Sequence, residues 1–204
     1  MEALAISPAT LASLIIAVSF AAGLNVYATV CTLGILARLH WLVLPGQLGA
    51  LEHTWIIAAS AALFAGEFFA DKIPGFDVVW NALHTFIRIP AAALMAYAAG
   101  SHLSPEQQML VTVVGAAIAA IAHSSKTFAR IAVTPSPEPV SNIALSSAED
   151  VGAIGLTWFA THHPLIAGAI AGTLTVGLIA VFASTYRRVR AALVRISRRR
   201  EGTS

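Results

Sequence analysis

The sequence predicts an all-α integral membrane protein with about six transmembrane segments, and three observations support this class. Only 11% of the 204 residues are charged and 57% are hydrophobic, whereas soluble domains carry about 25% charged residues. Several apolar runs approach or exceed the length of about 20 residues that a helix needs to cross a bilayer. The basic residues gather beyond residue 186, as expected for the cytoplasmic end of a membrane protein.

The first two predicted segments lie in the N-terminal third of the chain. Residues 10–37 are uncharged, and Gly23 and Asn25 interrupt the apolar sequence near its centre. Residues 55–70 continue into a charged stretch that closes with a Pro-Gly turn at residues 74–75. We expect both segments to be membrane helices, the first of them tilted because it exceeds the bilayer thickness.

The third and fourth segments carry charged or titratable side chains within apolar sequence. They are predicted at residues 78–99 and 107–133. The side chains concerned are His84, Arg88, His123, Lys126 and Arg130. A charge at the centre of a membrane helix costs about 2.5–3.5 kcal/mol on insertion scales, so each of these residues requires a partner or a function.

The fifth segment, residues 140–160, is the weakest because its first half is polar. Such a segment is typical of a broken or re-entrant helix, which is tolerated only where protein or water covers it. The sixth, residues 164–186, is uncharged and carries three glycines, which allow neighbouring helices to approach closely. We therefore expect a tightly packed bundle with one irregular element.

The chain divides into a membrane domain, residues 1–186, and a basic tail, residues 187–204. The tail contains seven arginines, and basic residues near the ends of membrane helices remain cytoplasmic. With six segments, both termini then lie on the cytoplasmic side of the membrane. The tail is expected to contact anionic lipid, and no binding to nucleic acid is expected of so short a basic stretch.

The two halves of the membrane domain share a pattern. Asp77 precedes a small-residue helix marked by Pro90, and Asp150 precedes one marked by Pro164. Three-segment halves of opposite orientation are the inverted-repeat plan of many transporters. The halves would comprise residues 10–100 and 106–186. The alternative is a chance alignment of alanine-rich helices, because the spacing of the flanking acidic residues differs between the halves.

Basic side chains at membrane depth form the first candidate site. Arg88 lies about ten residues into its segment, and His84 shares its helical face four residues earlier. His123 and Lys126 share a face of the next segment with nearby hydroxyl groups, and Asn25 lies at the interruption of the first. Such groups suit a phosphate or another small anion. The alternatives are a structural ion pair at Arg88 and a lysine that snorkels to the headgroups.

Acidic side chains form the second candidate site. Glu67 and Asp71 are four residues apart and share a helical face, and Asp77 follows across the turn. Glu149 and Asp150 lie within the fifth segment if that segment begins with its polar residues. These carboxylates suit a cation site or a proton relay. The alternative is that they are solvated loop residues.

No motif predicts catalysis, a metal or a cofactor. The sequence lacks a Walker loop, a Rossmann glycine pattern and the zinc-protease motif His-Glu-x-x-His. The adjacent His162 and His163 are a weak metal signal without further ligands. The single Cys31 lies in an apolar run, as a buried structural thiol does. The sequence therefore favours a non-enzymatic function.

Five strings of the sequence carry a resemblance to a known family. They are residues 23–28, the stretch from Glu67 to Asp77, His84-x-x-x-Arg88, His123-x-x-Lys126-x-x-x-Arg130 and Ser147-x-Glu149-Asp150-Val151. Together they resemble the domain of unknown function 4126 family of uncharacterised bacterial membrane proteins. The resemblance covers residues 10–186 and omits the arginine tail. It implies a multi-pass membrane protein and supplies no established activity.

The combined pattern predicts a small transporter or a translocator of lipid headgroups. In it the basic residues hold a phosphate or another anion, and the acidic residues pair with them or take up coupling protons when the site is empty. One alternative is a cation or proton pathway through the carboxylates, with the basic residues as counter-ions. The others are that the protein is a structural partner of another membrane protein, or that it is an intramembrane lipid enzyme. A second copy of the chain, in a homo-oligomer, is a further candidate partner. Membrane lipids surround the protein in every case.

Overall fold

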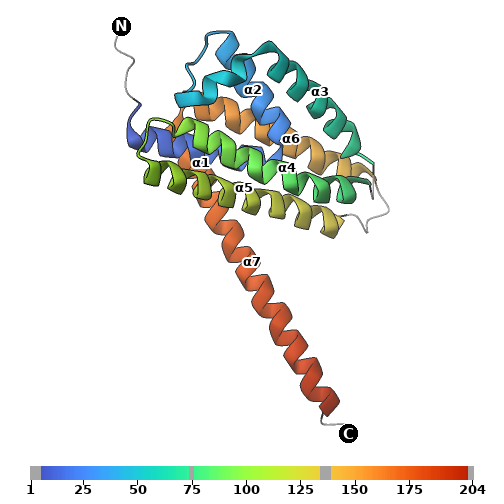
Figure 1. The fold of residues 1–204 in the computed structure, drawn as a ribbon. Helices are drawn as coiled ribbons and strands as arrows, with labels where there is room; N and C mark the ends of the chain where they lie inside the picture. Colours follow the sequence, from blue (N-terminus) through green and yellow to red (C-terminus); the bar gives the residue numbers. More distant parts are fainter. Residues whose placement is uncertain (1–5, 74–75, 134–138, 202–204) are drawn as a thin grey trace.

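The computed structural model describes residues 6–73, 76–133 and 139–201, and the regular structure in these ranges is entirely helical (Figure 1). The elements are α1 (Pro8–Leu24), α2 (Val26–Arg38), the 3-10 helix η1 (Gly46–Glu52), α3 (Thr54–Ala70), α4 (Phe76–Ala99), α5 (Pro105–Val133), α6 (Pro139–His162) and α7 (Pro164–Glu201). This arrangement confirms the all-α prediction.

Two helices, α1 and α2, replace the single first segment that the sequence predicted. The Ser7 Oγ caps α1 by accepting a hydrogen bond from the Thr10 N–H at 3.1 Å. Asn25 then adopts an extended conformation, with φ −150° and ψ 103°, which ends α1. The Asn25 Oδ1 accepts from the Ala28 N–H at 3.0 Å and so caps α2. The break is tolerated inside the bundle because this side chain supplies an acceptor that the helix no longer provides.

Three helices are long and apolar enough to cross a membrane. The stretches concerned are Val79–Ala99 in α4, Pro105–Ala129 in α5 and Pro164–Ala192 in α7. The pair of η1 and α3 passes the same test jointly, but it is bent by 74°, as in a broken span or a re-entrant loop. The helices α1 and α2 are apolar but have only 17 and 13 residues. The described residues thus provide three or four candidate spans, and the structure does not confirm the predicted count of six.

The fifth segment is not broken, contrary to the expectation from its polar first half. It forms the continuous helix α6, which has 24 residues. Glu149 and Asp150 in this helix are buried and bond to side chains of other elements. Because tertiary partners bond to both of these carboxylates, α6 stays continuous although its first half is polar.

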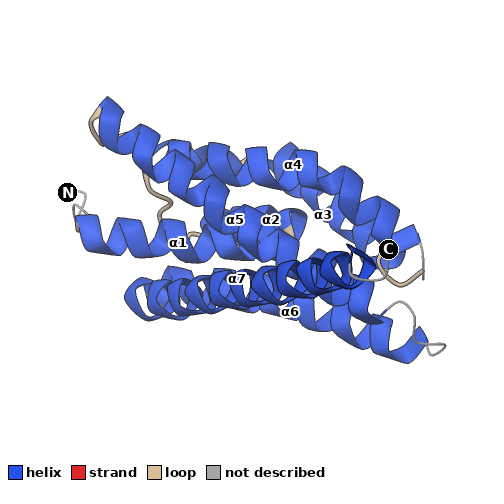
Figure 2. Ribbon diagram, turned by 90° about the horizontal axis from the view of Figure 1, so that it is seen from below, coloured by secondary structure: helices blue, strands red, loops and turns tan. Residues whose placement is uncertain are grey.

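The helix α1 forms the centre of the bundle. It packs against α4, α5, α6 and α7, and every residue from Ala17 to Gly23 is buried. Figure 2 shows α1 running between α4 on one side and the pair of α6 and α7 on the other. Small residues allow these contacts, since a Cβ at Gly168 of α7 would lie 2.6 Å from the Ser13 Cβ of α1.

The helix α7 continues from the sixth predicted segment into the arginine tail. Its C-terminal part projects beyond the other helices (Figure 1). Large apolar side chains on this helix are exposed, among them Leu174, Val176 and Val181. A contiguous exposed apolar surface of this kind marks contact with a membrane or with another protein.

The inverted repeat stays a prediction, and one difference between the halves weighs against it. The first segment of the N-terminal half is divided at Asn25. The first segment of the C-terminal half is α5, which runs without interruption over 29 residues. The two halves therefore differ at the position where the first half departs most from a regular helix.

Gly23→Ala is expected to destabilise the protein, although alanine is the better helix former by about 1 kcal/mol. The added Cβ would lie 2.5 Å from the Ala119 carbonyl oxygen and 2.7 Å from the Ala122 Cβ, so α1 and α5 would have to separate. The melting temperature in detergent should fall. Gly177→Ala is the matched control, because a Cβ there meets nothing within 4 Å. Equal melting temperatures for the two variants would contradict the close packing.

Candidate functional site

A group of buried charged side chains lies where α3, α4, α5 and α6 meet the break between α1 and α2. Its charged members, the buried cluster, are Glu67, Asp71, Arg88, Lys126, Glu149 and Asp150. None of them is more than 7% exposed. The neutral side chains that bond to them include Asn25, Asn81 and His123. Charged side chains are almost never buried to this extent unless they are paired.

Arg88 joins α3, α4 and α5. Its Nη2 forms an ion pair with the Glu67 Oε1, which comes from the last turn of α3. Its Nη1 donates to the Asn81 Oδ1 and to the His123 Nδ1, both at 3.0 Å. Arg88 and Glu67 are fully buried. Removing one partner of such a pair leaves an uncompensated charge and costs about 3–5 kcal/mol.

The ammonium group of Lys126 lies among four oxygen atoms, the oxygen cage. They are Asp71 Oδ2 at 2.9 Å, the Leu24 carbonyl oxygen at 3.2 Å, and Glu67 Oε1 and Glu149 Oε2 at 3.3 Å each. Leu24 is the last residue of α1. In an unbroken helix its carbonyl would accept from the Ala28 N–H, which here donates to the Asn25 side chain instead. The helix break therefore makes this carbonyl available to the lysine.

Asn25 connects the helix break to α6. Its Nδ2 donates to the Asp150 Oδ1 at 2.9 Å, while its own Oδ1 caps α2. Ser146 lies one turn before Asp150 and is fully buried. Neither the Ser146 Oγ nor the Asp150 Oδ2 has a hydrogen-bond partner within the described part of the chain.

The hydrogen bonds of His123 define its protonation state. A guanidinium group can only donate, so the His123 Nδ1 must accept from Arg88 and carries no proton. The Nε2 lies 2.7 Å from the Thr85 Oγ1, whose own proton is directed to the Asn81 carbonyl at 3.2 Å. The Nε2 is therefore the donor to Thr85, and His123 is neutral while Arg88 holds this position.

His84 lies beside the buried cluster in an aromatic setting. Its Nδ1 donates to the Trp80 carbonyl at 2.7 Å, and its ring stacks on the Trp80 ring at a centroid distance of 4.4 Å. The Tyr27 ring approaches it edge-on at 5.7 Å. His84 is thus close to the residues predicted as ligands, but its described contacts are with the carbonyl and ring of Trp80 and the ring of Tyr27. The side chain of Asp77, also predicted, lies outside the described residues.

The structure thus brings together most of the residues that the sequence singled out. The basic and the acidic sets form one site, because Arg88 and Lys126 bond directly to the carboxylates. Sequence reasoning missed Asn81 and Thr85, which lie seven and three residues before Arg88. That spacing places both polar side chains on or near the Arg88 face of α4, which is a signal for their role.

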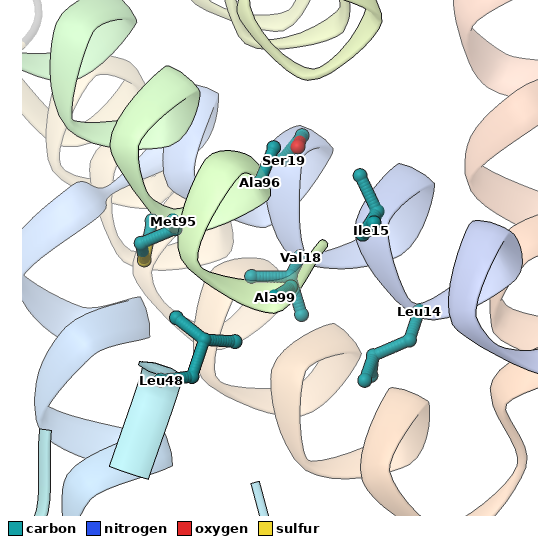
Figure 3. A pocket seen from close by; sticks show the side chains of 8 residues that line it. All are labelled: Leu14, Ile15, Val18, Ser19, Leu48, Met95, Ala96 and Ala99. Atoms are coloured by element: carbon teal, nitrogen blue, oxygen red, sulfur yellow. The ribbon is translucent and has the colours of Figure 1, made fainter. Parts of the chain in front are cut away.

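A small pocket lies apart from the buried cluster, between α1, η1 and α4 (Figure 3). Its lining is almost entirely apolar and contains none of the predicted site residues. The lining residues are Leu14, Ile15, Val18, Ser19, Leu48, Met95, Ala96 and Ala99. With the described side chains in their observed positions, which include the Lys126 ammonium between three carboxylates, no group of three or more His, Cys, Asp or Glu side chains is placed to hold a metal ion.

The fold and the cluster define an all-helical protein with three helices of membrane-spanning length and a charged interior. The chain belongs to the family described as "Domain of unknown function (DUF4126)", whose model matches residues 12–184. This match confirms the family resemblance seen in the sequence, and the arginine tail lies outside it. No curated protein and no solved structure matches the chain.

Asn25→Ala is expected to lower the free energy of unfolding more than Ser7→Ala does, although both residues cap a helix. The loss of a cap costs about 1 kcal/mol. At Asn25 the buried Asp150 carboxylate also loses a donor, which costs about 1–3 kcal/mol more. Ser7 is exposed, so water can replace its cap. Unfolding in detergent compares the variants, and equal losses would mean that the Asn25–Asp150 bond contributes nothing.

Nitrogen-15 NMR of labelled histidine should show His123 as a neutral ring protonated on Nε2. The reason is that Arg88 donates to the His123 Nδ1. His123→Gln identifies the signal by its disappearance, and the exposed His102 provides a reference ring outside the cluster. An imidazolium signal for His123 at neutral pH would contradict this assignment of the hydrogen bonds.

Proposed function

We propose that the protein is a small multi-pass membrane transporter in which the carboxylates of the buried cluster take up protons or cations. One observation carries this proposal: among the described residues, buried carboxylates outnumber buried basic groups. The carboxylates are Glu67, Asp71, Glu149 and Asp150, and the basic groups are Arg88 and Lys126. If all six are ionised, these described side chains carry a formal charge of −2.

A surplus of negative charge among buried side chains is unfavourable in a helical bundle. The effective penalty for burying an ion is several kcal/mol, even after the protein relaxes. A buried carboxylate without a counter-ion therefore binds a proton or a cation instead. We expect the cluster to be neutralised in this way when closed and to release its load where water reaches it. Ionisable residues with these properties mark ion and proton pathways in membrane proteins.

The anion or lipid-headgroup hypothesis receives less support from the same contacts. Arg88 and Lys126, its strongest ligands, already pair with Glu67, Asp71 and Glu149. A phosphate would add negative charge to a cluster that has an excess of it, and it would have to displace carboxylates that then lose their counter-ions. The charge balance therefore favours the cation or proton pathway over the anion site.

We also place both termini of this transporter in the cytoplasm of a bacterial cell, with the basic tail against anionic lipid of the inner membrane. The support is that Arg187, Arg188 and Arg190 are exposed near the C-terminal end of the apolar stretch Pro164–Ala192 of α7. Each basic residue near an anionic membrane surface contributes about 1 kcal/mol of attraction.

Flux into proteoliposomes tests the transport proposal. The vesicles that contain the reconstituted protein enclose a pH indicator. A membrane potential that is negative inside drives the uptake of protons or cations. We expect protein-dependent acidification or uptake of isotopic sodium or rubidium. Glu67→Gln and Asp71→Asn should each lower the rate at least tenfold, because each removes a carboxylate from the pathway. Glu106→Gln, at an exposed glutamate in the first turn of α5, is the matched control and should keep the wild-type rate.

The other outcomes separate the competing functions. If correctly folded protein moves neither protons nor cations, the proposal is wrong and the cluster is a structural element. If the wild type binds or moves phosphate or a phospholipid and Arg88→Ala does not, the anion function replaces the cation or proton function.

A further inference from the structure

We infer that the oxygen cage is a site for a monovalent cation, and that the Lys126 ammonium occupies it as a tethered substitute for a free ion. The inference stands on the geometry of the cage and holds whether or not the protein transports anything. It assigns Lys126 a role different from that of Arg88, which is a fixed counter-ion.

The first argument is the set of atoms around the lysine nitrogen. Three carboxylate oxygens and the Leu24 carbonyl surround it at 2.9–3.3 Å. Carboxylate and carbonyl oxygens are the ligands of hard cations, and carbonyls at broken membrane helices coordinate such ions. An ammonium group donates only three hydrogen bonds, yet four oxygens approach this one. A spherical ion has no preferred directions and accepts all four.

The second argument comes from buried oxygens next to the cage. The Glu67 Oε2 has no hydrogen-bond partner among the described residues, although the other oxygen of this carboxylate belongs to the cage. The same holds for the Ser146 Oγ and the Asp150 Oδ2. Glu149 is a cage residue of α6. Ser146 lies three residues before it and shares its helical face, and Asp150 follows it directly. These atoms are available as additional ligands when a bare ion replaces the ammonium.

The dimensions and the charge both favour a monovalent ion. The cage oxygens lie 2.9–3.3 Å from the lysine nitrogen, so the cage is far wider than the shell of about 2.0–2.1 Å that Mg²⁺ requires. Exchange of one ammonium for one Na⁺ or K⁺ also leaves the charge of the buried cluster unchanged. The side chain of Lys126 has a flexible four-carbon stem, so its head can leave the cage without movement of α5.

Removal of the lysine charge should therefore create a cation dependence that the wild type lacks. The thermal unfolding of Lys126→Ala is measured in detergent at increasing NaCl or KCl, with choline chloride keeping the ionic strength constant. A bound ion stabilises the folded state in proportion to the logarithm of its concentration above Kd. We expect a rise in Tm of about 4 °C per tenfold increase in Na⁺ or K⁺ for this variant. The wild type should show none.

Two further variants make the test specific. Lys72→Ala removes the other lysine of the chain, whose ammonium bonds to the Phe68 carbonyl and lies over the Phe68 ring outside the cage. It should gain no cation dependence. Glu67→Gln combined with Lys126→Ala removes one cage carboxylate and should shift the dependence to higher concentrations by at least tenfold.

The inference is overturned if Lys126→Ala responds equally to Na⁺, K⁺ and choline, or is stabilised by acid alone. Lys126→Met, which keeps an apolar stem, serves the same comparison if the alanine variant does not fold. Because this measurement needs no flux, a failure of the transport assay leaves its result intact, and the reverse also holds.

Discussion

Arg88 and Lys126 place two positive charges between helices that are otherwise apolar, and the compensation of these charges organises much of the structure. The last turn of α3 supplies Glu67, and Asp71 is the residue that ends this helix. The break at Asn25 supplies a backbone carbonyl, and the polar half of α6 supplies Glu149. Each buried ion carries a penalty of several kcal/mol, which is comparable to the total stability of about 5–15 kcal/mol of a typical domain. Such a cluster tolerates little variation in the positions of its members.

The sequence predicted the helices and most members of the cluster, because both depend on local information. Apolar runs of sufficient length indicate membrane helices, and a charge within such a run indicates a residue that needs a partner. The spacing of Glu67 and Asp71 placed both on one face, and both now contact the same lysine. These inferences required no knowledge of how the helices pack.

The sequence did not show which residues bond to one another, and two errors followed. Asp150 bonds to Asn25 across 125 residues of sequence, and Lys126 bonds to the Leu24 carbonyl across 102. Without these contacts, the polar half of α6 suggested a broken helix, and the first segment was expected to be continuous. The break lies instead at Asn25, between α1 and α2, and Asn25 bonds to Asp150 of α6. The sequence also did not show how many carboxylates pair with each basic group, which left the choice between an anion and a cation function open.

The break at Asn25 also has a consequence for the order in which the protein is assembled during synthesis. At 1.5 Å per residue, α1 spans about 26 Å and α2 about 20 Å, each less than the hydrocarbon thickness of about 30 Å. The partners of the break, Lys126 and Asp150, leave the ribosome long after the first helices do. Until then, an interrupted α1–α2 segment would expose backbone groups to lipid, which no membrane structure tolerates. In a bilayer, a continuous apolar helix is therefore the form of this segment that lipid tolerates until α5 and α6 supply the partners of the break.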